Sequence, residues 1–170
     1  MDVNPDDPGG YLRLLMADVP AISNTVRAYA EEALHAYNAR LYRASAVMLG
    51  VASEAAVLEV ATALTALMTE AERRTYLQVI EARKQNYVAK FEAFQQKLRS
   101  KKDRLPEELS DGLDLTLNAV ADLLRLYRND AGHPSGKKVD RGDCFIHLRM
   151  FVRYAQKLYL LKTRLEESHA

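Results

Sequence analysis

The sequence has 170 residues, the length of one ordinary domain, and a chain of this size buries enough apolar surface to fold without a metal or disulfide staple. Its 24 Lys and Arg residues balance 23 Asp and Glu residues, so neither a long disordered tail nor a uniformly basic nucleic-acid coat is expected. A single cysteine excludes an internal disulfide, and the opening residues lack the pattern of a secretory signal, so we expect a cytoplasmic protein.

The first twenty residues combine four Asp with Pro and Gly, which predicts a flexible N-terminal arm over residues 1–20. A single helical domain is expected over residues 21–168. Its first helix is predicted from about Ser23 to Tyr37, because Ser23 is a good N-cap residue.

The next helix is predicted over roughly Leu41 to Met68. Its most apolar part, from Ala44 to Met68, is long enough to cross a bilayer, but Glu54 and Glu59 lie near its middle. A carboxylate at the centre of a bilayer costs about 3 kcal/mol. We therefore interpret this stretch as the buried central helix of a bundle and expect no membrane association.

Thr69 and Glu72 have the spacing of a capping box, so one helix is predicted from Thr69 to the basic run 97–102. Its apolar positions are Ile80, Tyr87, Phe91, Phe94 and Leu98. The basic run fits a solvated helix end that complements the helix dipole, and a phosphate-binding patch is the alternative.

Two further helices complete the pattern. Pro106 and Ser110 or Asp111 begin a helix whose apolar positions are Leu113, Leu117, Val120, Leu124 and Tyr127. Asp140 and Asp143 can cap the last helix, whose apolar positions are Phe145, Leu148, Val152, Ala155 and Tyr159. Amphipathic helices with short links predict an all-α fold, an up-and-down bundle of four to five helices.

Motifs for the common cofactors and metals are missing from the sequence. It contains no Gly-rich phosphate loop, no GxSxG elbow and no paired Cys/His pattern. Cys144 and His147 lie three residues apart on one helix, but two ligands without a third favour core packing over a metal site. We expect no cofactor and no metal.

The segment from Arg128 to Pro134 gathers a guanidinium, an amide, a carboxylate and an imidazole at the end of a predicted helix. Helical spacing places the base of Arg128 beside the apolar seam, where a cation needs an anion. Gly132 and Pro134 stop the helix and hold His133 on the turn. Any stopped helix also contains such residues, so this spacing alone leaves both interpretations open.

Arg128 to His133 fits the Arg-x4-6-His signature, in its Arg-Asn-x3-His form, of HEPN (higher eukaryotes and prokaryotes nucleotide-binding) domains. The stretch from Tyr42 to Glu54 also resembles the second helix of bacterial HEPN-like proteins related to the DUF4145 and abortive-infection groups. The two matches lie in the expected order, and helices are predicted across residues 22–165.

This resemblance implies a HEPN-like bundle, commonly a homodimer in which two Arg/His loops face each other, and a metal-independent endoribonuclease of the toxin or phage-defence type. His133 would handle the proton of the 2′-hydroxyl or leaving oxygen, Arg128 would stabilise the phosphorane, and Asn129 would orient phosphate or Arg128. An antitoxin or defence-system partner protein is then expected. The alternative is a non-catalytic HEPN module that binds nucleotide, RNA or a protein.

Several residues around this motif complete the prediction. Ser135 stands where members silenced by tyrosine modification have Tyr, so that regulation is not expected. Asp130 and Glu54 are supporting residues: Asp130 adds negative charge beside the motif, and Glu54, on an otherwise apolar stretch, is expected to pair with Arg128. The candidate RNA-binding residues, for which a solvated helix face is the alternative, are Lys137, Lys138, Arg141, Arg149 and Arg153, with Lys157 on the same stripe.

Overall fold

A computed structural model describes residues 3–82, 84, 86–105, 112–113, 116–118, 120 and 138–167. All regular structure in these residues is helical, which confirms the all-α fold. The helices are α1 (Pro8–Asp18), α2 (Asn24–Asn38), α3 (Tyr42–Ala63), the 3₁₀ turn η1 (Leu64–Leu67), α4 (Glu70–Ile80), α5 (Tyr87–Ser100), the 3₁₀ turn η2 (Lys102–Arg104) and α8 (Arg141–Glu167).

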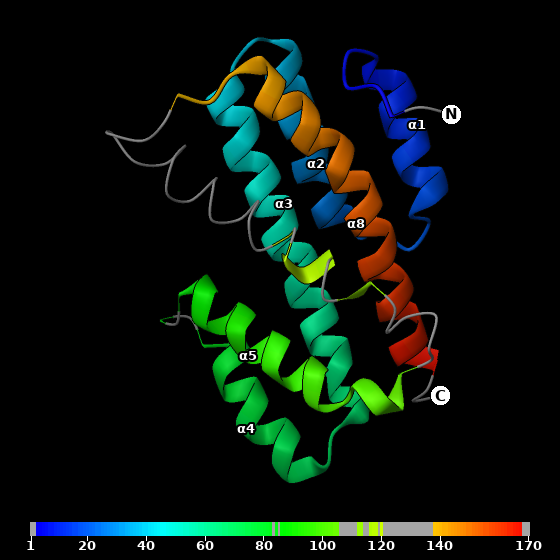
Figure 1. Ribbon diagram of the computed structural model, residues 1–170, viewed down its shortest axis with the longest axis vertical. Coiled ribbons are helices and arrows are strands. Elements are labelled where there is room, and N and C mark those ends of the chain that lie inside the picture. Colours follow the sequence, from blue (N-terminus) through cyan, green and yellow to red (C-terminus); the bar gives the residue numbers. More distant parts are fainter. Residues whose placement is uncertain are drawn as a thin grey trace.

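Helix α3 is the centre of the molecule, as the sequence predicts. It packs against α2 and α8 along its length, and α4 and α5 lie at its C-terminal end (Figure 1). Small buried residues such as Gly50, Ala52 and Ala56 let the neighbouring backbones approach closely. Inside this packing, the hydroxyl of Ser53 bonds to the Leu49 carbonyl and to Tyr154.

The chain from Tyr42 to Leu67 is the one part of the described residues long and apolar enough to cross a membrane. Half of its most apolar window is buried inside the fold, between α2 and α8. A core helix of a folded bundle has the same length and composition, so this segment does not establish a membrane protein.

Helix ends were the most predictable local feature. The Ser23 hydroxyl accepts a hydrogen bond from the amide of Val26 at 3.2 Å and caps α2. Thr69 and Glu72 form the predicted capping box at the start of α4. Each such cap satisfies backbone groups that the helix cannot pair itself, and a cap contributes about 1 kcal/mol.

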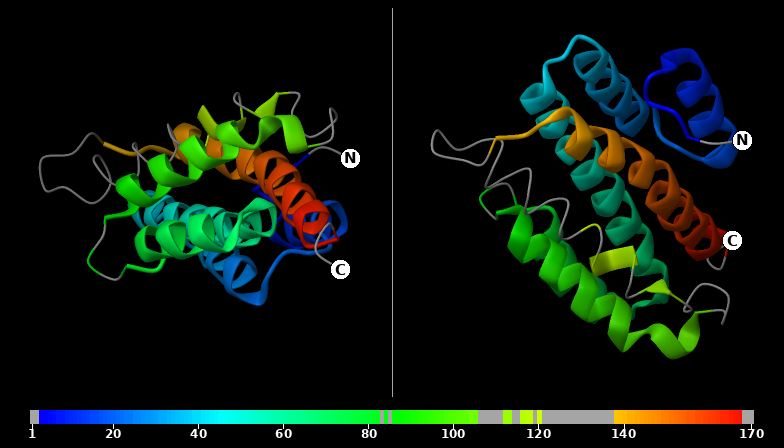
Figure 2. Two further views of the ribbon diagram at one scale, coloured as in Figure 1. Left: turned by 90° about the horizontal axis from the view of Figure 1, so that it is seen from below. Right: turned by 45° about the horizontal axis from the view of Figure 1, so that its top comes forward.

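The single helix predicted from Thr69 to residue 102 is instead a hairpin of two helices, α4 and α5, which lie side by side (Figure 2). The break follows Ile80. Helix α5 then begins after Asn86, whose side chain caps it by accepting a hydrogen bond from the amide of Ala89 at 2.9 Å. Tyr76 and Ile80 on α4 and Phe91 and Phe94 on α5 form the buried side of the hairpin.

The flexible arm expected over residues 1–20 differs from the structure, in which α1 forms and packs against α2 and α8 (Figure 1). Asp7 caps the helix by accepting a hydrogen bond from the amide of Gly10 at 3.0 Å, and Pro8 opens it. Tyr11 and Leu15 are buried, and the Tyr11 hydroxyl donates to the Leu148 carbonyl of α8 at 2.8 Å. The Asp and Pro residues that suggested a flexible arm therefore form the start of α1.

In the stretch before α8, Leu113, Leu117 and Val120 are buried, in agreement with their predicted core positions. Leu124 and Tyr127, the other two positions of that stripe, lie outside the described residues.

Candidate functional site

The motif itself lies outside the described residues: this applies to Arg128, Asn129, Asp130 and His133, and also to Lys137. The structure describes the ends of the segment that carries them. Val120 is buried before it, and Val139 packs against the core after it. Both ends of the motif-bearing segment are thus anchored to the bundle.

The start of α8 is fixed by a reciprocal pair of carboxylates. The Asp143 amide donates to Asp140 Oδ1 at 3.0 Å, and the Asp140 amide donates to Asp143 Oδ2 at 3.4 Å. This arrangement confirms the predicted cap and places two acidic side chains at the positive end of the helix dipole. It sets where the chain leaves the motif segment and becomes helical.

Arg141, a predicted RNA-binding residue, is engaged within the fold. Its Nη2 lies 2.7 Å from Asp6 Oδ2, and its guanidinium lies over the rings of Tyr37 at 5.8 Å and Phe145 at 5.9 Å. The Tyr37 hydroxyl donates to Asp6 Oδ1 at 2.8 Å. Arg141 thus ties the N-terminal segment to the first turn of α8 rather than standing free for phosphate.

This cluster shifts the ionisation of its members. The hydrogen bond from Tyr37, and then the contact with Arg141, lower the pKa of Asp6. Partial burial and the bond to Asp6 raise the pKa of Tyr37 to about 12, and Asp6 raises the pKa of Arg141. Asp6 therefore remains a carboxylate and Arg141 a cation at neutral pH.

The other predicted RNA-binding residues within the described range differ in their availability. Arg149 is half-buried and stacks over Phe145 at 5.7 Å. Lys138, Arg153 and Lys157 are exposed, and no ion pair involves them within the described part of the chain. An incoming anion can reach all three of these cations.

Glu54 lies half-buried on α3, while its expected partner Arg128 lies outside the described residues. Sequence reasoning missed the polar cluster around Glu59, five residues further along α3. Glu59 accepts hydrogen bonds from Ser23 Oγ at 2.6 Å and from the Tyr159 hydroxyl at 2.8 Å. Burial raises the pKa of Tyr159 to about 12, and Glu59 adds to the rise. The cluster joins α2, α3 and α8.

Cys144 and His147 pack within the fold. The Cys144 thiol is buried and donates to the Tyr42 carbonyl at 3.2 Å, and burial raises its pKa to about 11. Burial also lowers the pKa of His147. No group of three or more potential metal ligands gathers anywhere in the described residues.

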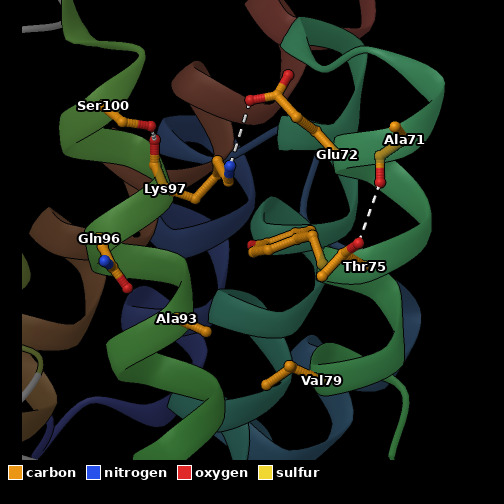
Figure 3. Close-up of a pocket in the computed structure, with 9 residues that line it drawn as sticks. Ala71, Glu72, Thr75, Val79, Ala93, Gln96, Lys97 and Ser100 are labelled. Carbon is orange, nitrogen blue, oxygen red and sulfur yellow. Dashed lines mark hydrogen bonds and ion pairs between the residues drawn. The ribbon is translucent and has the colours of Figure 1, made fainter.

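The basic run at the end of α5, together with Arg104 after it, holds the hairpin together. Lys97 and Lys101 lie 3.3 and 2.9 Å from Glu72 Oε1, and Arg104 donates to the Leu67 carbonyl at 2.6 Å. The hydrogen bond from the Thr69 backbone and the one from Lys101 lower the pKa of Glu72 to about 2. Figure 3 shows the Glu72–Lys97 pair at the edge of a groove of about 510 Å³ between α4 and α5.

No family model, no curated protein and no solved structure matches this chain.

Proposed function

We propose that this chain is a HEPN-like, metal-independent endoribonuclease of the cytoplasm that cuts RNA at the loop containing Arg128 and His133. The observation that carries the proposal is the Arg-Asn-x3-His sequence, which ends eight residues before the last helix in a chain whose described regular structure is all helical. Buried Val120 before the segment and partly buried Val139 after it support the proposal, because a catalytic loop must be held by a rigid scaffold.

The proposed reaction is attack by a ribose 2′-hydroxyl on its own 3′-phosphate. His133 would accept the hydroxyl proton or deliver one to the departing 5′-oxygen, since the ordinary pKa of imidazole is near 6.5. Arg128 would neutralise the extra negative charge on the five-coordinate phosphorus, and Asn129 would orient the phosphate. The products are a 2′,3′-cyclic phosphate and a 5′-hydroxyl, with no cofactor consumed.

Local cations would attract the RNA, because the whole chain carries a net charge of only +1. Lys138, three residues before α8, and Arg153 within α8 are exposed, and neither has an ion-pair partner among the described residues. Binding by so few phosphate contacts would weaken as salt is raised, with a modest slope. A homodimer with two facing loops and a toxin or defence role belong to the same proposal.

The experiment compares wild type with His133→Ala on total RNA in the presence of EDTA, followed by analysis of the fragment ends. Cleavage that leaves 2′,3′-cyclic phosphate and disappears in the variant supports the proposal. His35→Ala is the matched control, because His35 is exposed on α2. Sedimentation of the wild type at micromolar concentration tests the dimer, and a monomer would remove a shared cleft.

The second candidate is a HEPN-like module without chemistry that binds nucleotide, RNA or a protein partner. The mixture of exposed apolar and cationic side chains on α8 favours this module. Cations alone would suffice to contact phosphates, so the exposed apolar side chains indicate a different kind of contact. RNA binding retained by both wild type and His133→Ala, with no cleavage by either, would select the module.

A further inference from the structure

The outer face of α8 carries a regular stripe of side chains opposite to the helix face that packs in the core. We call it the α8 stripe, and its residues are separated alternately by four and three positions. It consists of Ile146, Met150, Arg153, Lys157, Leu160 and Arg164. Alternating spacings of four and three average 3.5 residues, which is the repeat of a helix seam that packs against another helix.

The apolar members of the α8 stripe are open to solvent. Ile146 is 55% exposed, Leu160 48% and Met150 37%, although all three lie on a helix that is otherwise well packed. Figure 1 shows α8 on the near side of the bundle, with no described helix drawn in front of it. Single exposed apolar residues are ordinary, but here they recur in register along one seam.

The charges of α8 are one-sided. Between Asp143 and Glu166 the helix has no acidic residue. Arg164, at the end of the α8 stripe, pairs with Glu167 at 3.1 Å. Arg153 and Lys157 are exposed and make no ion pair within the described part of the chain. From Ile146 to Leu160 the stripe therefore has apolar ends and a cationic centre, and Arg164 beyond it is paired with Glu167.

We propose that the α8 stripe docks an amphipathic helix of a partner protein, with apolar residues at both ends of its contact face and acidic residues at its centre. The stripe is about 27 Å long at 1.5 Å per residue, so a partner helix of about 20 residues would cover it. Its acidic side chains would pair with Arg153 and Lys157 while its apolar side chains cover Ile146 and Leu160. This inference does not depend on RNA cleavage at Arg128 and His133.

A second copy of this chain fits the stripe poorly. In an antiparallel pairing Arg153 would face Lys157 of the second copy. In a parallel pairing each of these cations would face the same residue of the second copy. Both arrangements bring like charges together at the centre of the contact, which costs affinity.

RNA also fits less well than an acidic helix. Phosphates would satisfy Arg153 and Lys157, and a base could stack on Arg153, but the exposed apolar members of the stripe are aliphatic and offer bases no aromatic surface. The exposure of Ile146 and Leu160 would then have no explanation. A partner helix accounts for the cations and the apolar residues together.

The test uses two labelled helical peptides of about 20 residues in fluorescence anisotropy titrations with the full chain. The acidic peptide has Leu at both ends of its stripe and Glu at the two central positions, and the basic peptide has Lys at those two positions. We expect the wild type to bind the acidic peptide at least about tenfold more tightly than the basic one.

Two double variants separate the charge from the apolar contribution. Arg153→Glu with Lys157→Glu should reverse the preference, so that the basic peptide binds more tightly. Ile146→Ser with Leu160→Ser should weaken the acidic peptide by about tenfold or more. Circular dichroism should remain that of the wild type, because all four side chains point to solvent.

The matched control is Arg74→Glu with Lys84→Glu, which makes the same change in net charge at exposed positions outside α8. It should leave the preference for the acidic peptide unchanged.

Several outcomes would overturn the inference. These are failure of the wild type to bind the acidic peptide, a preference that charge reversal does not change, or an equal effect of the control. If single-stranded RNA binds through Arg153 and Lys157 while neither peptide binds, the stripe is a nucleic-acid surface. If sedimentation shows a dimer that Ile146→Ser with Leu160→Ser dissociates, the stripe joins two copies.

Discussion

Replacement of Tyr11 by alanine tests whether the N-terminal helix is an integral part of the fold. Tyr11 is only 1% exposed, and its hydroxyl donates to the Leu148 carbonyl in the N-terminal third of α8. Truncation of a buried aromatic side chain costs about 3–5 kcal/mol. For a chain of this length each kcal/mol lowers the melting temperature by about 2–4 °C, so Tyr11→Ala should melt about 10 °C lower.

The assays are thermal unfolding, which gives the melting temperature, and urea unfolding, which gives the free energy, both followed by circular dichroism with two companion variants. Tyr11→Phe removes only the hydroxyl and should cost about 1 kcal/mol. Met16→Ala removes an exposed side chain of the same helix, 49% accessible, and should change the free energy of unfolding by less than about 0.5 kcal/mol. If Tyr11→Ala lowers the free energy of unfolding no more than Met16→Ala does, then α1 does not pack against the bundle in solution.

Three further predictions concern a turn, a surface carboxylate and a thiol. Arg40 has a φ of 62° between α2 and α3, so Arg40→Gly should stabilise the protein by about 0.5–1 kcal/mol, whereas Ala39→Gly, at a φ of −79°, should destabilise it; thermal unfolding of both checks the sign. The pKa of Glu72 is lowered from 4.5 to about 2, so the ionised carboxylate stabilises the fold. Wild type should therefore be more stable than Glu72→Gln above pH 4.5, and the difference in free energy of unfolding should vanish as the pH falls to about 2. Unfolding at several pH values measures this difference, and a difference that does not change with pH would contradict the prediction. Cys144 is buried with a pKa raised to about 11, so an aromatic disulfide reagent at pH 8 should label it at the rate of unfolding, and immediate labelling would contradict its burial.

Much of the fold could be predicted because its signals are local. Ser23, the pair of Thr69 and Glu72, and the pair of Asp140 and Asp143 all cap the helices that they were expected to cap. The apolar stretch of α3, with its small residues, correctly indicated a central helix.

The missed helix break after Ile80 has a specific cause. Ile80 and Tyr87 are seven residues apart, which is two helical turns, so the apolar stripe keeps its phase across the break. Periodicity alone cannot detect a hairpin whose two helices share that phase. The signal that could have found it is Asn86, a good N-cap residue that bonds the amide of Ala89.

The role of single charges near the candidate site could not be predicted, because their partners are distant in sequence. Arg141 was expected to contact RNA, yet Asp6, at the other end of the chain, holds it. Glu59 likewise meets Tyr159 across the bundle. Local sequence shows which residues are charged, and only the packing of α1, α2 and α8 shows which of them remain free.

The measurement that tests the proposed activity most directly is the single-turnover cleavage rate of one defined RNA in EDTA by wild type and His133→Ala. General acid–base catalysis contributes about 100-fold to 10,000-fold, so the variant should be slower by at least about 100-fold, and a 2′-deoxy residue at the cut site should abolish cleavage by the wild type. Equal rates for the two proteins, or cleavage next to the 2′-deoxy residue, would contradict catalysis at this loop.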